Sequence, residues 1–185
     1  MEWIKANSQN LERIQSINKY KNINLLYLSP NPIENNEDSE GDCEFIEVKV
    51  TGIPSTADLK QIIFSLQNDY DIGDRVNCFY LNGERCWLDK ATRIDLIYSL
   101  NIQKAAEKLN TVLWLNGKAY EVSIDYLLGF LEDLELYAID CYNVTQIHLS
   151  QIAQIADREE LFNYNVACDY PTPLEFDVNQ IIHTW

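Results

Sequence analysis

The stretch from Asp125 to Ala156 constrains this chain more than any other part of its sequence. It contains no proline and a single glycine, Gly129, and its apolar residues recur at helical spacing, which predicts one long helix. At 1.5 Å per residue such a helix is roughly 45 Å long, more than the width of a small domain. We therefore expect it to contact more than its own small domain.

Alternate steps of four and three residues along this helix select a seam that is apolar at both ends and small or polar in the middle. A second apolar row lies off the seam, so more than one side of the helix needs cover. We expect the first half to pack on sheets, and the later half, from Val144 to Ile155, to be the freer candidate for oligomer contact. The predicted partner or oligomer interface consists of Leu134, Ala138, Cys141, Thr145, His148, Ile152, Ile155 and Trp185.

The chain is strongly acidic, with 29 acidic and 14 basic residues and a formal net charge of −15. The charge is uneven, because the part from Ala119 onward contains 12 acidic residues and one basic residue, Arg158. Nucleic-acid binding is disfavoured, since phosphate contacts need clustered lysine and arginine. The acidic second part is either a solvated surface or a face that binds a basic protein.

Residues that support catalysis or metal binding are few. The sequence has two histidines and no glycine-rich phosphate loop, GxSxG motif or HExxH motif. Cys141 and His148 share the seam, but two helical turns, about 10 Å, separate them, which is too far for a thiolate–imidazole pair. We expect no catalytic residues, no cofactor and no metal. His148 is interpreted as a seam residue satisfied by a hydrogen bond, with a zinc site as the less favoured alternative.

The five cysteines form no CxxC pair. The first 20 residues do not resemble a signal peptide, and no apolar run approaches the length that spans a bilayer. We therefore expect reduced thiols and no membrane insertion.

The first part of the chain predicts a small α+β unit. Helical spacing of its apolar residues favours a short helix over Trp3–Asn18. Ile23–Leu28 is typical of a buried strand that Ser29–Pro32 would stop, and Phe45–Val50 alternates as a second strand. A helix over Ala57–Tyr70 follows.

The segment Glu34–Glu44 contains six acidic residues and almost nothing to bury, which predicts a mobile loop. A calcium-binding loop is the alternative for so many acidic residues. It is less favoured because the ligand spacing and the fixed glycine of such loops are absent.

An internal repeat is the most informative local pattern. FYLNGERCWL, Phe79–Leu88, and LWLNGKAYEV, Leu113–Val122, share Leu-Asn-Gly after two apolar residues, and both lead into a helical pattern. Asn-Gly is the strongest short signal for a β-hairpin. Two consecutive hairpin–helix units are therefore expected. The first turn would pair Phe79 with Cys86 and point Cys78 to the opposite face, so these cysteines are expected to be core thiols.

Capping residues define the expected helix ends. Asp89 is the expected N-cap of a helix that extends to about Leu109, and Asp125 the expected N-cap of the long helix. Asp157 is expected to cap a further short helix. The apolar end of the chain, with Ile181, Ile182 and Trp185, should pack on the domain or anchor in a neighbour.

These elements together predict an α+β fold. Residues 1–75 form an N-terminal α+β attachment unit with the acidic loop at 34–44. Residues 76–176 form a duplicated hairpin–helix domain with the long helix at 125–156, and 177–185 form an apolar tail.

The order of the pieces from Phe79 to Phe176 resembles a known family. The pieces are CWLDKATR, TVLWLNGKAYEV, ELYAIDCYNVTQIH and EELFNYNVACDYPTPLEF. They are similar to an uncharacterised C-terminal domain family of tailed-bacteriophage proteins, and the ending resembles that of tail-fibre assembly proteins. The most specific parts are Trp-Leu-Asp-Lys-x-Thr-Arg and Cys-Tyr-Asn-Val-Thr-x-x-His. The resemblance covers about half of the chain and provides no catalytic residues to carry over.

The resemblance implies a non-enzymatic phage structural protein, a virion component of the tail, collar or fibre attachment region. Its expected partners are other virion proteins and further copies of itself, and its expected location is the virion, or the host cytoplasm during assembly. One alternative is a tail-fibre assembly chaperone. The other is a glycan-binding module, which would use exposed aromatic side chains such as Trp114 and Trp185.

Overall fold

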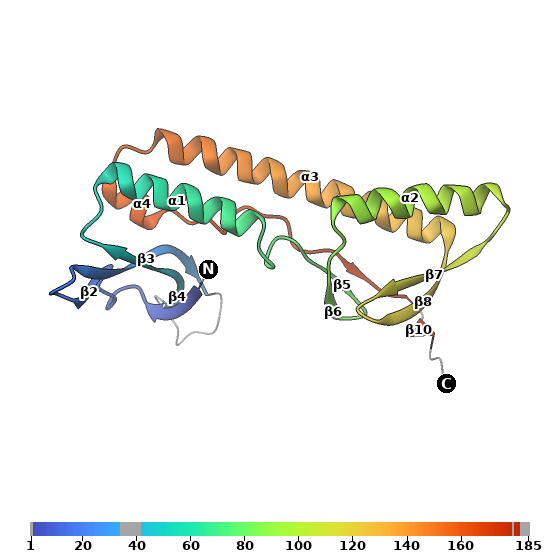
Figure 1. The fold of residues 1–185 in the computed structure, drawn as a ribbon, viewed down its shortest axis with the longest axis horizontal. Coiled ribbons are helices and arrows are strands. Elements are labelled where there is room, and N and C mark those ends of the chain that lie inside the picture. The colour runs from blue at the N-terminus through green and yellow to red at the C-terminus, as the bar shows by residue number, and fades with distance from the viewer. Residues whose placement is uncertain (1, 34–41, 179, 182–185) are drawn as a thin grey trace. The chain divides into compact units, whose positions relative to one another are not determined.

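The computed structural model describes residues 2–33, 42–178 and 180–181 and has the expected α+β fold. Figure 1 shows its helices and strands. The chain divides into two compact units, one formed by residues 1–73 with 143–170 and the other by residues 74–142 with 171–185. The domain boundaries expected from the sequence differ from this division, because residues 143–170 group with the N-terminal part.

The first unit contains an antiparallel sheet in the order β1-β4-β3-β2. The strands are β1 (Glu2–Asn7), β2 (Ile14–Asn18), β3 (Ile23–Pro32) and β4 (Asp42–Thr51). The helix predicted over Trp3–Asn18 is wrong. Its residues form β1 and β2 instead, because β1 pairs with β4 and β2 with β3. Non-local strand pairing here overrides a local helical spacing.

Strand β3 continues beyond the point where Ser29–Pro32 was expected to stop it. Ser29 has a positive φ of 54°, and the register with β4 shifts between Leu28 and Asn31. Pro30 therefore lies in an irregularity, where the backbone N–H that proline lacks is not needed, and Pro32 pairs with Cys43 at the end of the strand. The side chain of Ser29 is fully buried and accepts a hydrogen bond of 2.9 Å from the backbone N–H of Val166.

Two helices of this unit begin at strong caps. Helix α1 (Thr56–Asp71) begins with a capping box between Ser55 and Asp58, and α4 (Arg158–Asn163) has the expected N-cap Asp157. Arg13 holds α4 to the sheet, since its guanidinium donates to the backbone carbonyls of Tyr27 and Phe162. The expected loop at 34–44 lies outside the described residues except for 42–44, which belong to β4.

The second unit confirms the internal repeat. Strands β5 (Phe79–Leu81) and β6 (Glu84–Cys86) precede α2 (Lys90–Ala105), and strands β7 (Asn110–Leu115) and β8 (Lys118–Ser123) precede α3 (Ile124–Gln154). Asn82-Gly83 and Asn116-Gly117 all have positive φ, as the hairpin turns require. Phe79 pairs with Cys86 as expected. All five cysteines of the chain are thiols, and Cys78 and Cys86 are buried.

The later chain adds a strand to each hairpin. Strand β9 (Glu175–Phe176) pairs in parallel with β5, and β10 (Gln180–Ile181) pairs with β8. Phe176 brings its ring to 6.0 Å from Phe79 and 4.2 Å from Phe130 on α3. This aromatic cluster joins the first hairpin, β9 and the first part of α3 in one core.

The sequence predicted the position of the long helix correctly, but it predicted the wrong N-cap residue. Helix α3 ends at Gln154, and at its start the side chain of Ser123, rather than Asp125, accepts the backbone N–H of Tyr126 at 3.2 Å. Asp125 instead pairs with Lys104 of α2 at 2.7 Å. Helix α2 has the expected N-cap Asp89 but ends at Ala105, before Leu109. Residues 124–142 of α3 belong to the second unit and 143–154 to the first.

Replacing either of two glycines by alanine should change the free energy of unfolding in opposite directions. Gly117 has φ +76°, whereas Gly129 lies within α3, and a methyl group added at either position meets no atom within 4 Å. We expect Gly117→Ala to lower the free energy of unfolding by about 1 kcal/mol, because the left-handed turn strains an L residue. Gly129→Ala should raise it by about 0.5–1 kcal/mol through helix propensity. Urea denaturation of both variants measures this, and equal signs would contradict the turn assignment.

Candidate functional site

The α3 seam, which the sequence predicted to be a partner or oligomer interface, is mostly buried within the chain itself. Of the eight predicted interface residues, six are less than 10% exposed. Ala138 is half-buried, and Trp185 lies outside the described residues. The six buried residues are Leu134, Cys141, Thr145, His148, Ile152 and Ile155.

This burial corrects two expectations. Six of the described seam residues pack in the chain's own core rather than on its surface. The later half of α3 is not the freer half, because Ile152 is as buried as Leu134, and Ile155, just past the end of α3, is buried as well. The large exposed apolar side chains of α3 lie off the seam: Tyr126, Leu136, Ile139, Tyr142 and Ile147.

The polar middle of the seam is explained by a buried hydrogen-bond chain in the first unit. The Thr145 hydroxyl lies 2.6 Å from a carboxylate oxygen of Asp71 and 2.6 Å from the Tyr170 hydroxyl. Because a carboxylate only accepts, Thr145 donates to Asp71 and accepts from Tyr170. Tyr170 in turn accepts from the Gln67 amide at 2.8 Å. Thr145 and Gln67 are buried, so this chain satisfies the Thr145 hydroxyl and the Gln67 amide nitrogen, whereas the Gln67 amide oxygen has no hydrogen-bond partner among the described residues.

His148 belongs to a second buried polar group in the same unit. Its Nε2 lies 3.0 Å from the backbone carbonyl of Cys168, and its Nδ1 lies 2.6 Å from the Tyr164 hydroxyl. Since a carbonyl only accepts, Nε2 carries a proton. The ring also stacks on Tyr170 with centroids 5.9 Å apart. This confirms the interpretation of His148 as a seam residue satisfied by hydrogen bonds.

Ligand atoms of His148, Cys168 and Asp169 lie within 4.8 Å of one another, and this is the metal-type cluster found among the described residues. Both ring nitrogens of His148 are already in hydrogen bonds, so a metal ion would have to displace one of them. The Cys168 thiol donates to the carbonyl of Asn165 and to Asp169. Burial, with Asp169 beside it, raises the pKa of this thiol to about 11, which disfavours the thiolate that binds metals.

The raised pKa values predict alkaline instability. Burial raises the pKa of Cys168 from 9.0 to about 11 and that of Tyr170 from 10.0 to about 12. The unfolded chain therefore loses these protons first, and the stability they provide is complete below pH 9 and is lost as pH rises toward 12. Because the thiol is half-buried, its share should be less than the ~1.4 kcal/mol per pH unit of a fully buried group.

We expect Cys168→Ser to flatten the fall of stability between pH 9 and 11, since serine keeps the hydrogen-bond donor and does not titrate there. Urea midpoints of both proteins from pH 7 to 11 measure this. If the urea midpoints of the two proteins fall in parallel with pH, the prediction is contradicted and the thiol is accessible to water in the folded chain.

The second unit contains an ion pair whose arginine is buried. Arg93 of α2 is 4% exposed and donates from two nitrogens to one oxygen of Glu135 on α3, at 2.9 and 2.8 Å. A third nitrogen donates to the backbone carbonyl of Leu88 at 2.7 Å, and the guanidinium lies 5.4 Å from the Trp87 ring centroid. Arg93 thus connects the end of the first hairpin, α2 and α3. It acts as a structural group in this unit.

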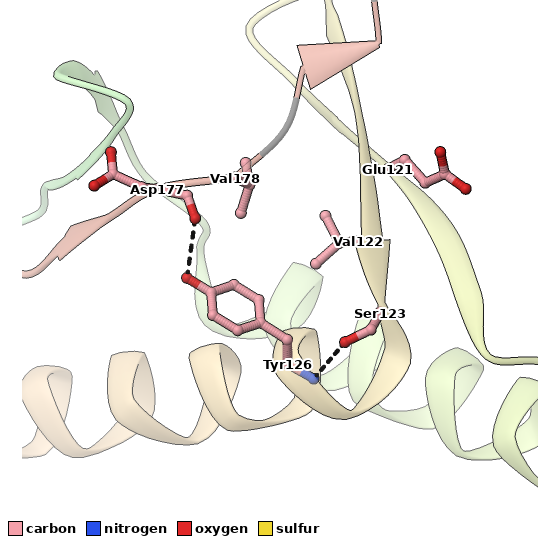
Figure 2. A pocket seen from close by; sticks show the side chains of 6 residues that line it. All are labelled: Glu121, Val122, Ser123, Tyr126, Asp177 and Val178. Atoms are coloured by element: carbon pink, nitrogen blue, oxygen red, sulfur yellow. Dashed lines mark hydrogen bonds between the residues drawn. The ribbon is translucent and has the colours of Figure 1, made fainter.

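A pocket of about 330 Å³ lies between β8, the start of α3 and the segment after β9. Figure 2 shows the Tyr126 ring and the side chains of Val122 and Val178 at its centre, with the carboxylates of Glu121 and Asp177 directed away from them. The Tyr126 hydroxyl donates to the Asp177 carbonyl at 3.4 Å. The pocket is therefore lined by polar and apolar groups together, and its two carboxylates do not converge in it.

An exposed apolar line on α2 was missed by sequence reasoning. Ile94, Tyr98 and Ile102 are 54%, 71% and 54% exposed. They lie on one side of α2, while Arg93 and Leu100 on the other side are buried. Their spacing of four residues was visible in the sequence, but α2 has apolar residues all round, and only the structure shows which face is covered.

A second exposed pair lies on β7. Val112 and Trp114 are 47% and 60% exposed and share one face of the strand by alternation. Trp114 is one of the aromatic residues that the glycan-binding alternative would use. Its apolar neighbour on the same face is more typical of a protein contact than of a sugar subsite.

Among the described residues, none of the helices combines the length and the hydropathy that crossing a bilayer requires. Comparison with family models, curated proteins and solved structures gave no match to this chain.

Proposed function

We propose that this chain is a non-enzymatic structural protein that acts through protein–protein contacts. The observation that carries the proposal is the set of large apolar side chains left exposed on the second unit, above all Ile94, Tyr98 and Ile102 of α2. Exposed apolar side chains arranged on one face of an element mark interaction surfaces more often than scattered ones do. The titratable groups that converge, around His148, are engaged in hydrogen bonds that build the core.

The setting that we propose is a tailed bacteriophage, with the chain in the tail, collar or fibre attachment region. Two short runs support it by resemblance, Trp87–Arg93 and Cys141–His148. In the structure these runs contribute buried residues, including Arg93, Cys141 and His148. These two runs therefore contribute to the core of the second unit and of α3. The exposed faces are where this chain would contact its partners.

Mass spectrometry of purified particles of the encoding phage tests the proposal. We expect the chain at a stoichiometric level that withstands high salt, since apolar contacts are not screened by ions. Its absence from finished particles, together with loss of soluble fibre when the gene is deleted, would replace the proposal with the assembly-chaperone alternative. Its absence without any effect on fibres would contradict both.

A further inference from the structure

The exposed apolar line on α2 extends over the whole helix. Ala91 and Ala105 continue it at either end, and both are exposed. We call these five residues, Ala91, Ile94, Tyr98, Ile102 and Ala105, the α2 stripe. Its members follow at steps of three, four, four and three residues, which keeps them on one side of a helix.

The α2 stripe reads the same in both directions from its centre. Ala91 and Ala105 are equally distant from Tyr98, and so are Ile94 and Ile102. The exposure follows the same symmetry, with 54% at both isoleucines and 71% at the tyrosine. In a twofold interface residue i of one copy meets residue j of the other and j meets i, so this order places apolar side chains against apolar side chains along the whole stripe.

We propose that α2 packs antiparallel against α2 of a second copy of this chain, with the twofold axis at Tyr98. Ile94 of one copy then meets Ile102 of the other, the two tyrosines meet at the axis, and the alanines allow close approach at both ends. The proposal rests on the proposed protein-contact function and names one partner for it.

The charges of α2 agree with this pairing. Arg93 and Lys104 already form ion pairs with Glu135 and Asp125 of the same chain. In the antiparallel register Lys90 lies opposite Ala106, and Asp95 lies opposite Asn101. No like charges within α2 face each other, and the like charges that the register brings together lie just beyond its ends, where the exposed Asp89 of each copy is opposite Glu107 of the other. Most of the net charge of −15 comes from the part of the chain from Ala119 onward, outside α2, which has 12 acidic residues and one basic residue.

Sedimentation equilibrium of the full chain, with the variant Tyr98→Glu, tests the pairing. We expect a reversible dimer, and Tyr98→Glu should raise its dissociation constant at least about tenfold, because it brings two unpaired carboxylates together at a buried axis. Tyr142→Glu is the matched control: Tyr142 is 58% exposed on α3, and its replacement should leave the dissociation constant unchanged. Thermal melting confirms that both variants fold, since both positions are exposed.

Disulfide trapping tests the direction of the pairing. In the antiparallel register, oxidation should link copies when Ile94→Cys and Ile102→Cys proteins are mixed, and neither variant should link to itself, whereas Tyr98→Cys should. Linking of Ile94→Cys to itself would indicate a parallel pair and overturn the proposal. The unsubstituted chain controls for its own five cysteines.

The failure of this proposal differs from that of the proposed function. A monomer at high concentration, or a dimer lost in Tyr142→Glu and kept in Tyr98→Glu, overturns the α2 pairing alone. A dimer that depends on Tyr98 but is absent from phage particles keeps the pairing and contradicts the virion role.

Discussion

Leu134→Ala is expected to lower the free energy of unfolding by about 3 kcal/mol, whereas Leu136→Ala should change it by less than about 0.5 kcal/mol. The two leucines are two residues apart on α3, and one is fully buried while the other is 62% exposed. The first substitution leaves a cavity in a packed core, and the second removes a side chain that water already contacts. Both keep good helix formers, so helix propensity changes little.

Urea denaturation of the two variants at a concentration where the chain is monomeric measures this difference. Similar small losses would mean that the seam is loosely packed in the single chain and that a partner completes it, as the sequence pattern alone indicated. A large loss at Leu136 and a small one at Leu134 would mean that the buried and exposed faces of α3 are exchanged.

Glu135→Ala is expected to be nearly as damaging, at about 2 kcal/mol, because it leaves the buried guanidinium of Arg93 without its carboxylate. The loss should be smaller than for a fully enclosed pair, since the Glu135 side chain is 35% exposed and water can approach it. Glu135→Gln should have an intermediate effect, because it keeps an acceptor for Arg93 and removes the charge.

The matched control is Glu132→Ala, which removes an exposed carboxylate from the same helix and should change stability by less than about 0.5 kcal/mol. The same urea experiment measures all three variants. Equal effects of Glu135→Ala and Glu132→Ala would show that the ion pair contributes nothing beyond surface charge.

Local signals in the sequence predicted local structure well. Asn82-Gly83 and Asn116-Gly117 fixed both hairpins, because few other residue pairs take positive φ at both turn positions. Asp89 and Asp157 marked helix starts through a short-range hydrogen bond from their own side chains. These features depend on residues at most a few positions apart, so no knowledge of the tertiary fold is needed.

Non-local contacts account for what the sequence did not reveal. The residues of β1 and β2 have helical spacing, and their strand state follows from pairing with β4 and β3. Likewise the pattern of α3 showed correctly that one face needs cover, but a pattern does not distinguish cover by the same chain from cover by a partner. Thr145 and His148 find their hydrogen-bond partners at Tyr164, Cys168 and Tyr170, in a segment without regular periodicity.

The structure therefore moves the candidate contact surface from the α3 seam to the α2 stripe. Helix α3 supplies buried residues to both compact units, which leaves its seam committed to the fold. The stripe on α2 is the apolar face that combines exposure with a self-complementary order. The role of the N-terminal sheet as an attachment unit stays a prediction.

Hydroxyl-radical footprinting of the full chain across a range of protein concentrations tests the α2 pairing most directly, since it reports solvent access to individual side chains. We predict that oxidation of Ile94, Tyr98 and Ile102 falls as concentration rises, while oxidation of Tyr142 and Ile147, which are similarly exposed, stays constant. Constant oxidation of Tyr98 at every concentration, or a fall at Tyr142 in its place, would contradict the assignment of α2 as the surface through which this chain meets its own copy.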